Sequence, residues 1–211
     1  YSRGCKLIII ACNSASAQAL RKIQQEYLPN KYPDLKILGV IRPIAEEIAR
    51  LKKIKKVGII GTKATVNSNI YNDEIKVFRD DLEIFQKATP LLVPLIEEGW
   101  IKKPETKMIL KKYLRYLKMK QVEALVLACT HYPFLLNDIK RIMGKRCYVL
   151  NTEKIISDSL FDYLNRHPEL NIQKKIKPRY QFCATDSVEK FKELGEFFLG
   201  HSIDEVEKVV L

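Results

Sequence analysis

The sequence lacks the long apolar runs that mark a membrane protein. None of its apolar stretches approaches the roughly 18 consecutive residues that a transmembrane helix needs. Its first residues also lack a basic segment followed by a long apolar one, which is the pattern of a secretory leader. We therefore expect a globular, cytoplasmic protein, and 211 residues suffice for one large domain or two modest ones.

Paired cysteines are also missing. The chain has five cysteines, an odd number, and no two of them form the Cys-x-x-Cys motif of redox and zinc sites. This composition favours free thiols in a reducing compartment over a framework of disulfides. The cysteines are Cys5, Cys12, Cys129, Cys147 and Cys183.

Negative charge is scarce as well. The chain has 37 Lys and Arg against 25 Asp and Glu, and the net charge of +12 can indicate a nucleic-acid surface. The lysines are scattered, however, and no lysine run alternates with the aromatic residues on which single-stranded bases stack. We therefore favour a solvated lysine-rich surface, and we expect neither nucleic acid nor a membrane as a partner.

Apolar runs rich in β-branched residues alternate with segments of helical periodicity along the whole chain. This alternation is typical of parallel strands joined by crossover helices, so the sequence predicts an α/β fold. The predicted strands are residues 7–11, 36–41, 56–60, 82–86, 124–128, 146–150 and 179–184. The predicted helices are residues 16–27, 43–51, 65–78, 104–118, 133–143, 153–164 and 188–198.

Two cysteines occupy matching positions. Residues 7–13 and 125–131 both read as a strand, an alanine, a cysteine and a polar residue. Because these segments are far apart in the sequence, they belong to different α/β units. The pattern predicts two similar lobes with one cysteine in each, Cys12 and Cys129.

Each of these cysteines lies where open α/β sheets bind ligands, at the carboxyl end of a strand. Free N–H groups at the start of the following helix stabilise a thiolate, so we expect the pKa of each thiol to fall. A lone buried cysteine more often packs as a small hydrophobe, but two matching copies favour catalysis over packing or a regulatory disulfide. Small polar neighbours that suit a charged substrate are Asn13, Ser14, Thr130 and His131.

Two more polar features are ambiguous on their own. His131 either exchanges a proton or binds a carboxylate beside Cys129, or it caps the backbone. The turn at residues 61–65 places the hydroxyls of Thr62 and Thr65 beside a predicted helix start, so it is either a carboxylate cradle or an ordinary N-cap. The remaining cysteines have no such placement and are expected to be packing residues, namely Cys5, Cys147 and Cys183.

Residues 11–17, Ala-Cys-Asn-Ser-Ala-Ser-Ala, and 128–133, Ala-Cys-Thr-His-Tyr-Pro, resemble the paired cysteine signatures of bacterial glutamate racemases. Further similarity at residues 39–43, 61–65, 93–98, 198–200 and 206–209 extends the resemblance over essentially the whole chain. His131 is the most discriminating position, because related aspartate racemases typically have glutamate there. An aspartate racemase, or another isomerase of the same superfamily, is the alternative.

The resemblance implies two similar α/β lobes with the active site in the cleft between them, and neither pyridoxal phosphate nor a metal. By matching positions, Cys12 would exchange the proton of D-glutamate and Cys129 that of L-glutamate, with His131 beside it and Glu97 supporting the site from its edge. D-glutamate would serve peptidoglycan synthesis, and a homodimer is one assembly that the family permits. The substrate would be held by Asn13, Ser14, Thr62, Thr65, Thr130 and His131.

The chain also departs from the family pattern. The family usually has threonine where Ser14 stands, although serine retains the hydroxyl. Family members begin with an Asp-Ser-Gly turn and a later Tyr-Gly turn that contribute to the site, and neither precedes Tyr1. We therefore expect an incomplete first lobe at residues 1–36 and 150–211, and a second lobe at residues 37–149. Such a chain would have weak stability and little racemase activity, or act as an inactive binding module.

Overall fold

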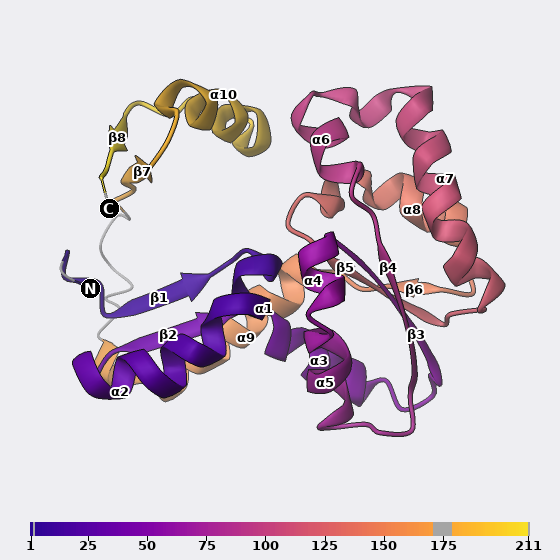
Figure 1. The fold of residues 1–211 in the computed structure, drawn as a ribbon, viewed down its shortest axis with the longest axis horizontal. Coiled ribbons are helices and arrows are strands. Elements are labelled where there is room, and N and C mark those ends of the chain that lie inside the picture. The colour runs from indigo at the N-terminus through magenta and orange to yellow at the C-terminus, as the bar shows by residue number, and fades with distance from the viewer. Residues whose placement is uncertain (2, 171–178, 211) are drawn as a thin grey trace. The chain divides into compact units, whose positions relative to one another are not determined.

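The computed structural model describes residues 1, 3–170 and 179–210. The chain divides into two compact units, Tyr1–Leu170 and Asn171–Leu211, and each is described by itself. Helices and parallel strands alternate, which confirms the α/β fold class (Figure 1). Within the described residues, no helix has the length and apolar character needed to span a membrane.

The described residues of the first unit form six strands in two sheets. The strands are β1 (Leu7–Ile10), β2 (Lys36–Gly39), β3 (Lys56–Gly61), β4 (Glu83–Ala88), β5 (Ala124–Ala128) and β6 (Tyr148–Val149). The longer helices are α1 (Asn13–Lys22), α3 (Ile41–Arg50), α5 (Ile70–Lys76), α7 (Pro104–Met119), α8 (Leu136–Met143) and α9 (Thr152–Arg166). The shorter helical segments are η1 (Ile23–Tyr27), α2 (Leu28–Lys31), α4 (Lys63–Asn67), α6 (Leu92–Glu97), η2 (Trp100–Lys102), η3 (Tyr132–Leu135) and η4 (Pro168–Leu170).

The larger sheet has four parallel strands in the order β4-β3-β5-β6. Successive side chains of a strand point to opposite faces. Val57 and Ile59 of β3 therefore join one core with α3 and α5, whereas Gly58 between them faces Leu117 of α7. Helices thus cover both faces of this sheet, as parallel sheets require.

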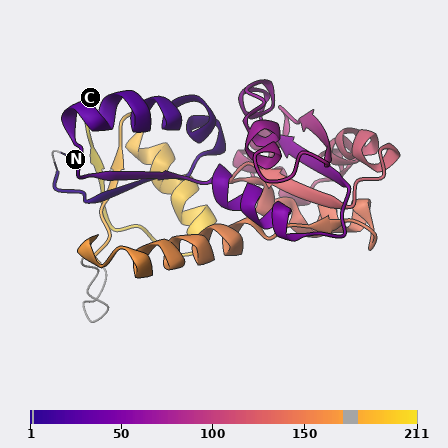
Figure 2. The ribbon, with the colours of Figure 1, turned by 90° about the horizontal axis from the view of Figure 1, so that it is seen from below.

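The smaller sheet consists of β1 and β2, which pair in parallel from Leu7 with Lys36 to Ile10 with Gly39. Figure 2 shows α1 on one side of these strands and α9 on the other. Helix α1 packs tightly on β2, because a Cβ atom at Gly39 would overlap Leu20 and would lie 3.0 Å from the Ser16 hydroxyl. This contact fixes the distance between α1 and the strand.

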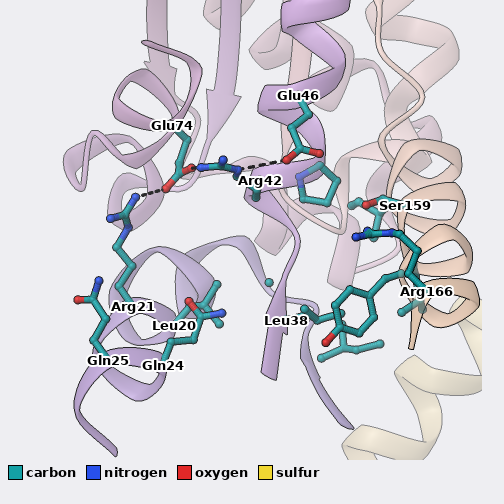
Figure 3. A pocket seen from close by; sticks show the side chains of 16 residues that line it. Leu20, Arg21, Gln24, Gln25, Leu38, Arg42, Glu46, Glu74, Ser159 and Arg166 are labelled. Atoms are coloured by element: carbon teal, nitrogen blue, oxygen red, sulfur yellow. Dashed lines mark hydrogen bonds and ion pairs between the residues drawn. The ribbon is translucent and has the colours of Figure 1, made fainter. Parts of the chain in front are cut away.

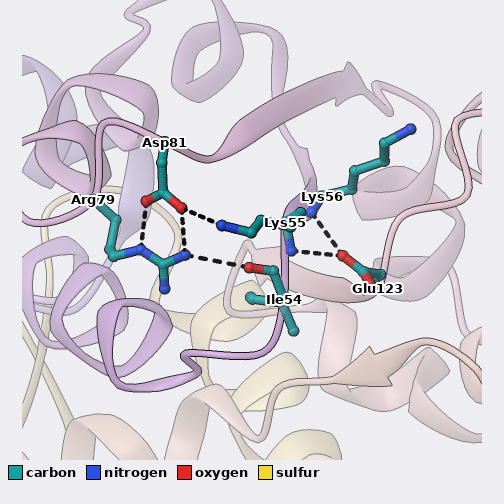
Figure 4. Close-up of polar contacts among 6 residues, drawn as sticks. All are labelled: Ile54, Lys55, Lys56, Arg79, Asp81 and Glu123. Atoms are coloured by element: carbon teal, nitrogen blue, oxygen red, sulfur yellow. Dashed lines mark hydrogen bonds and ion pairs between the residues drawn. The ribbon is translucent and has the colours of Figure 1, made fainter.

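Polar contacts tie the strands of the larger sheet together at their amino ends (Figure 4). The Glu123 carboxylate, just before β5, accepts hydrogen bonds from the backbone N–H groups of Lys55 (2.6 Å) and Lys56 (2.9 Å). These two bonds lower the pKa of Glu123. Close by, Arg79 donates two hydrogen bonds, of 2.6 and 2.8 Å, to Asp81.

The second unit contains β7 (Phe182–Ala184), α10 (Val188–Leu199) and β8 (Val206–Lys208). The two strands pair in parallel, with Phe182 opposite Val206. Ala184, Ile203 and Val206 form a small buried cluster between the strands and the helix. The Ser187 hydroxyl caps α10 by accepting a 3.1 Å hydrogen bond from the backbone N–H of Lys190.

Several predicted boundaries are wrong. The expected helix 65–78 is broken into α4 and α5, because Asn69 adopts a left-handed conformation with φ of 57°. The expected strand 146–150 is only two residues long, and β7 begins at Phe182 rather than at residue 179. Helix α6 and strand β8 were not predicted. The division into lobes 1–36 with 150–211 and 37–149 stays a prediction, although β2 itself pairs with β1.

Candidate active site

Three strands of the larger sheet end at the same level. The register places Gly61 of β3 opposite both Ala88 of β4 and Ala128 of β5. The next residue after each strand therefore begins a turn at one edge of the sheet, where α/β folds gather ligands. Those residues are Thr62, Thr89 and Cys129.

A cluster of three hydroxyls links α1 to the turn after β3. Thr62 caps α4, and its Oγ1 accepts a 3.1 Å hydrogen bond from the backbone N–H of Thr65. Ser14 of α1 places its Oγ 2.8 Å from the Thr62 hydroxyl and 3.1 Å from that of Thr65. The turn is therefore an N-cap, as one of the two alternatives predicted. Its two hydroxyls also contact Ser14, which lies two residues after Cys12.

Cys12 is the N-cap residue of α1, so its thiol lies at the positive end of the helix dipole. The thiol makes no capping hydrogen bond, and the residue is exposed. The next residue, Asn13, is buried, and its Oδ1 accepts a 2.6 Å hydrogen bond from the hydroxyl of Tyr71. The start of α1 is therefore anchored beside an accessible thiol.

Cys129 has a different environment. It is 7% exposed, and its Sγ lies 3.8 Å from Nδ1 of His131. Nε2 of His131 lies 3.2 Å from Oε1 of Glu97, the last residue of α6. The imidazole thus lies between the thiol and a carboxylate, which favours a role in the site over backbone capping.

The pKa of Cys129 moves in the opposite direction to the one expected from a helix start. The pKa of this thiol is raised to about 11, mainly by burial; a backbone hydrogen bond from His131 lowers it, and the charge of Glu97 acts in the same direction as burial. The segment after Cys129 is a turn and the short 3-10 helix η3, so it supplies little dipole to offset burial.

The hydroxyl of Tyr132 stabilises the turn after β5. It lies 2.6 Å from the hydroxyl of Thr89, which in turn donates a 3.1 Å hydrogen bond to the carbonyl of Gly61. All three residues are buried. This chain ties the turn after β5 to the ends of β3 and β4, and sequence reasoning did not assign a role to Thr89 or Tyr132.

The remaining predicted residues differ in their exposure. Thr130 is exposed, between Cys129 and His131. Cys147 is buried, as a packing residue should be, but Cys5 and Cys183 are exposed, so that prediction was wrong for them. Cys5 precedes β1, and Cys183 lies in the three-residue strand β7. No group of three or more His, Cys, Asp or Glu in the described part of the chain is arranged to hold a metal ion.

Comparison with known proteins places these motifs in a family. The family described as Asp/Glu/Hydantoin racemase matches residues 2–153. The glutamate racemase of Chlorobaculum parvum is 37% identical over 204 residues, which are 97% of this chain and 73% of that protein.

Solved structures agree with this match. The glutamate racemase isoform RacE1 from Bacillus anthracis has a TM-score of 0.88 at 28% identity, covering 98% of this chain and 74% of its own. The glutamate racemase of Francisella tularensis, solved in complex with D-glutamate, has a TM-score of 0.86 at 31% identity, covering 99% and 74%. The chain therefore belongs to the Asp/Glu/hydantoin racemase family, among relatives that are glutamate racemases.

Proposed function

We propose that this protein interconverts L- and D-glutamate without a cofactor, by moving the α-proton between Cys12 and Cys129. The observation that carries the proposal is geometric: Ser14, two residues after Cys12, lies 2.8 Å from Thr62, and the strand that ends before Thr62 pairs with the strand that ends before Cys129. The names of the matched relatives, and the D-glutamate bound to the Francisella tularensis enzyme, support glutamate as the substrate. We place this reaction in the bacterial cytoplasm, where D-glutamate supplies peptidoglycan.

Racemisation needs one acid or base on each face of the α-carbon, because the planar intermediate must gain its proton from the side opposite to the loss. In the D-to-L direction the thiolate of Cys12 takes the α-proton, and the thiol of Cys129 donates a proton to the other face. The raised pKa keeps Cys129 protonated and ready to donate. In the L-to-D direction the two thiols exchange roles.

The negative charge that develops on the substrate must be stabilised by fixed donors. The amide of Asn13 and the hydroxyls of Ser14, Thr62 and Thr65 are already held in place by hydrogen bonds to one another or to Tyr71. Such groups need little rearrangement when charge appears on the α-carboxylate. On the other side of the substrate, we assign binding to Thr130 and His131, with Glu97 orienting the imidazole.

The test is the substitution of each thiol in the full-length protein. Cys12→Ser and Cys129→Ser should each lower racemisation of glutamate by roughly a thousandfold or more, because a hydroxyl is a far weaker base than a thiolate. Circular dichroism at a fixed wavelength follows the change of handedness. Cys5→Ser, which alters an exposed thiol outside the site, is the matched control and should retain the wild-type rate.

Uptake of deuterium at the α-carbon from deuterated water distinguishes substrates. Glutamate should exchange far faster than aspartate, whereas the reverse would show an aspartate racemase.

Full racemisation by either serine variant would rule out the two-thiol mechanism.

A further inference from the structure

Helix α5 contacts helix α1 near both ends of α1. The hydroxyl of Tyr71 donates its 2.6 Å hydrogen bond to Asn13, the first residue of α1 and the neighbour of Cys12. One turn further along α5, the carboxylate of Glu74 binds Arg21, in the last turn of α1. Residues three apart share one face of a helix, so a single face of α5 holds the length of α1.

Glu74 connects three helices through two arginines (Figure 3). Its Oε1 binds Nη2 of Arg21 on α1, and its Oε2 lies 3.1 Å from Nη1 of Arg42 on α3. The Glu74 side chain is only 9% exposed, whereas those of Arg21 and Arg42 are 57% and 50% exposed. A buried carboxylate is costly unless its oxygens are paired, so both arginines are needed to keep it there.

Helix α5 is itself fixed to the sheet that carries Cys129. Tyr71 and Ile75 are fully buried in the same core as Val126 of β5, which ends one residue before Cys129. Close-packed cores transmit displacement rather than absorb it. The position of α1 relative to Cys129 is therefore set through α5.

The bond from Tyr71 also decides which end of the Asn13 amide is available. Burial raises the pKa of Tyr71, so its hydroxyl stays protonated and donates. The oxygen of the amide is occupied, and the NH₂ group is left as a donor. A donor is what the α-carboxylate of an amino acid needs.

We propose that Tyr71 and Glu74 are positioning residues of the racemase site: Tyr71 orients the amide of Asn13 toward the substrate carboxylate, and Glu74 holds α1 so that Cys12 faces Cys129. Neither residue touches the substrate. This inference rests on the proposed function, since positioning has a meaning only for the two-thiol reaction.

The two residues have different kinetic signatures. In the full-length protein, Tyr71→Phe should raise KM for both enantiomers about tenfold with a smaller change in kcat, because an unheld amide binds the carboxylate less well. Glu74→Gln should lower kcat at least about tenfold in both directions with little change in KM, because displacement of a reacting group slows chemistry. Glu74→Asp, which keeps the charge, should restore part of kcat.

Matched controls separate positioning from general damage. Tyr148→Phe removes the hydroxyl of an exposed tyrosine, and Glu47→Gln removes a carboxylate that pairs with Arg50 at 3.3 Å on the outside of α3. Both should retain wild-type kinetics. If Glu74→Gln fails to fold, Arg21→Gln breaks the same contact from its more exposed partner and should lower kcat in the same way.

Wild-type KM and kcat in both Tyr71→Phe and Arg21→Gln would overturn the inference. The inference would also be overturned if the losses of activity disappeared once each rate was divided by the folded fraction of the variant, measured by thermal unfolding. If instead the wild-type protein lacks racemase activity, the proposed function fails, and the two failures are thereby distinguished.

Discussion

At the scale of single residues, the two cysteines are unequal although their sequence motifs match. Cys12 is exposed at the start of an α-helix, whereas Cys129 is buried beside His131 and within reach of the negative charge of Glu97. Burial and negative charge both favour the protonated thiol. In the free enzyme we therefore expect Cys129 to carry its proton.

The charge of Glu97 gives a direct test of this environment. Because that charge raises the pKa of Cys129, Glu97→Gln should lower it, and the thiolate should appear at lower pH. The rate at which iodoacetamide modifies Cys129, followed by mass spectrometry, should rise toward about pH 11 in the wild type and at lower pH in the variant.

The neighbouring Glu98 supplies the control for this experiment. It is exposed, and it does not contribute to the pKa shift of Cys129. Glu98→Gln should therefore leave the modification profile of Cys129 unchanged. A profile for Glu97→Gln that superimposes on the wild type, or that shifts to higher pH, would contradict the electrostatic account.

At the scale of elements, the packing of α7 on the larger sheet depends on a glycine. A Cβ atom at Gly58 would lie 3.0 Å from Val122 and 3.2 Å from both Leu117 and Leu125, which are buried. Gly58→Ala should therefore destabilise the fold by about 1–3 kcal/mol, because a well-packed core has no room for another methyl group. The measurement is the free energy of unfolding in urea.

Gly61, in the same strand, is the matched control. An added Cβ there would meet its nearest atoms at 3.4 Å, which is an ordinary van der Waals distance. Gly61→Ala should thus cost clearly less stability than Gly58→Ala. Equal losses would mean that chain entropy or strand propensity, and not crowding by α7, determines the effect.

Sequence reasoning located strands better than it located contacts between helices. The apolar runs of β1, β3 and β5 marked the strands, and the carboxyl ends of β1 and β5 marked Cys12 and Cys129. By contrast, the left-handed turn at Asn69 depends on tertiary context. Helix propensity averaged over residues 65–78 predicts one continuous helix and does not reveal the break.

The contacts of Tyr71 and Glu74 were out of reach for a related reason. Tyr71 lies 58 residues from Asn13, and Glu74 lies 53 residues from Arg21, with no motif to connect either pair. Both also lie within a helix, where a tyrosine or a glutamate is unremarkable. Only the folded positions of α1, α3 and α5 bring these side chains together.

At the scale of the whole molecule, buried thiols make stability depend on alkaline pH. Burial raises the pKa of Cys147 to about 11, as it does for Cys129, whereas an unfolded thiol titrates near 9. The folded state therefore binds these protons more tightly. The resulting stabilisation is fully present below about pH 9 and is lost as the pH rises to about 11.

The urea midpoint should accordingly fall between pH 9 and pH 11 at constant ionic strength. Cys147→Ala removes one of the two groups, so its midpoint should fall less steeply over the same range, even if its stability at pH 7 is lower. A slope equal to that of the wild type would show that Cys147 titrates alike in the folded and unfolded states.

Strands β3 and β5 end at the same level. This restricts the positions at which relatives can gain or lose residues. One residue inserted into either strand would move Thr62 or Cys129 by about 3.3 Å along the strand and would turn alternate side chains from one face to the other. Insertions and deletions among relatives should therefore be confined to the turns and helices between strands, and the number of residues in β3 and β5 should not vary.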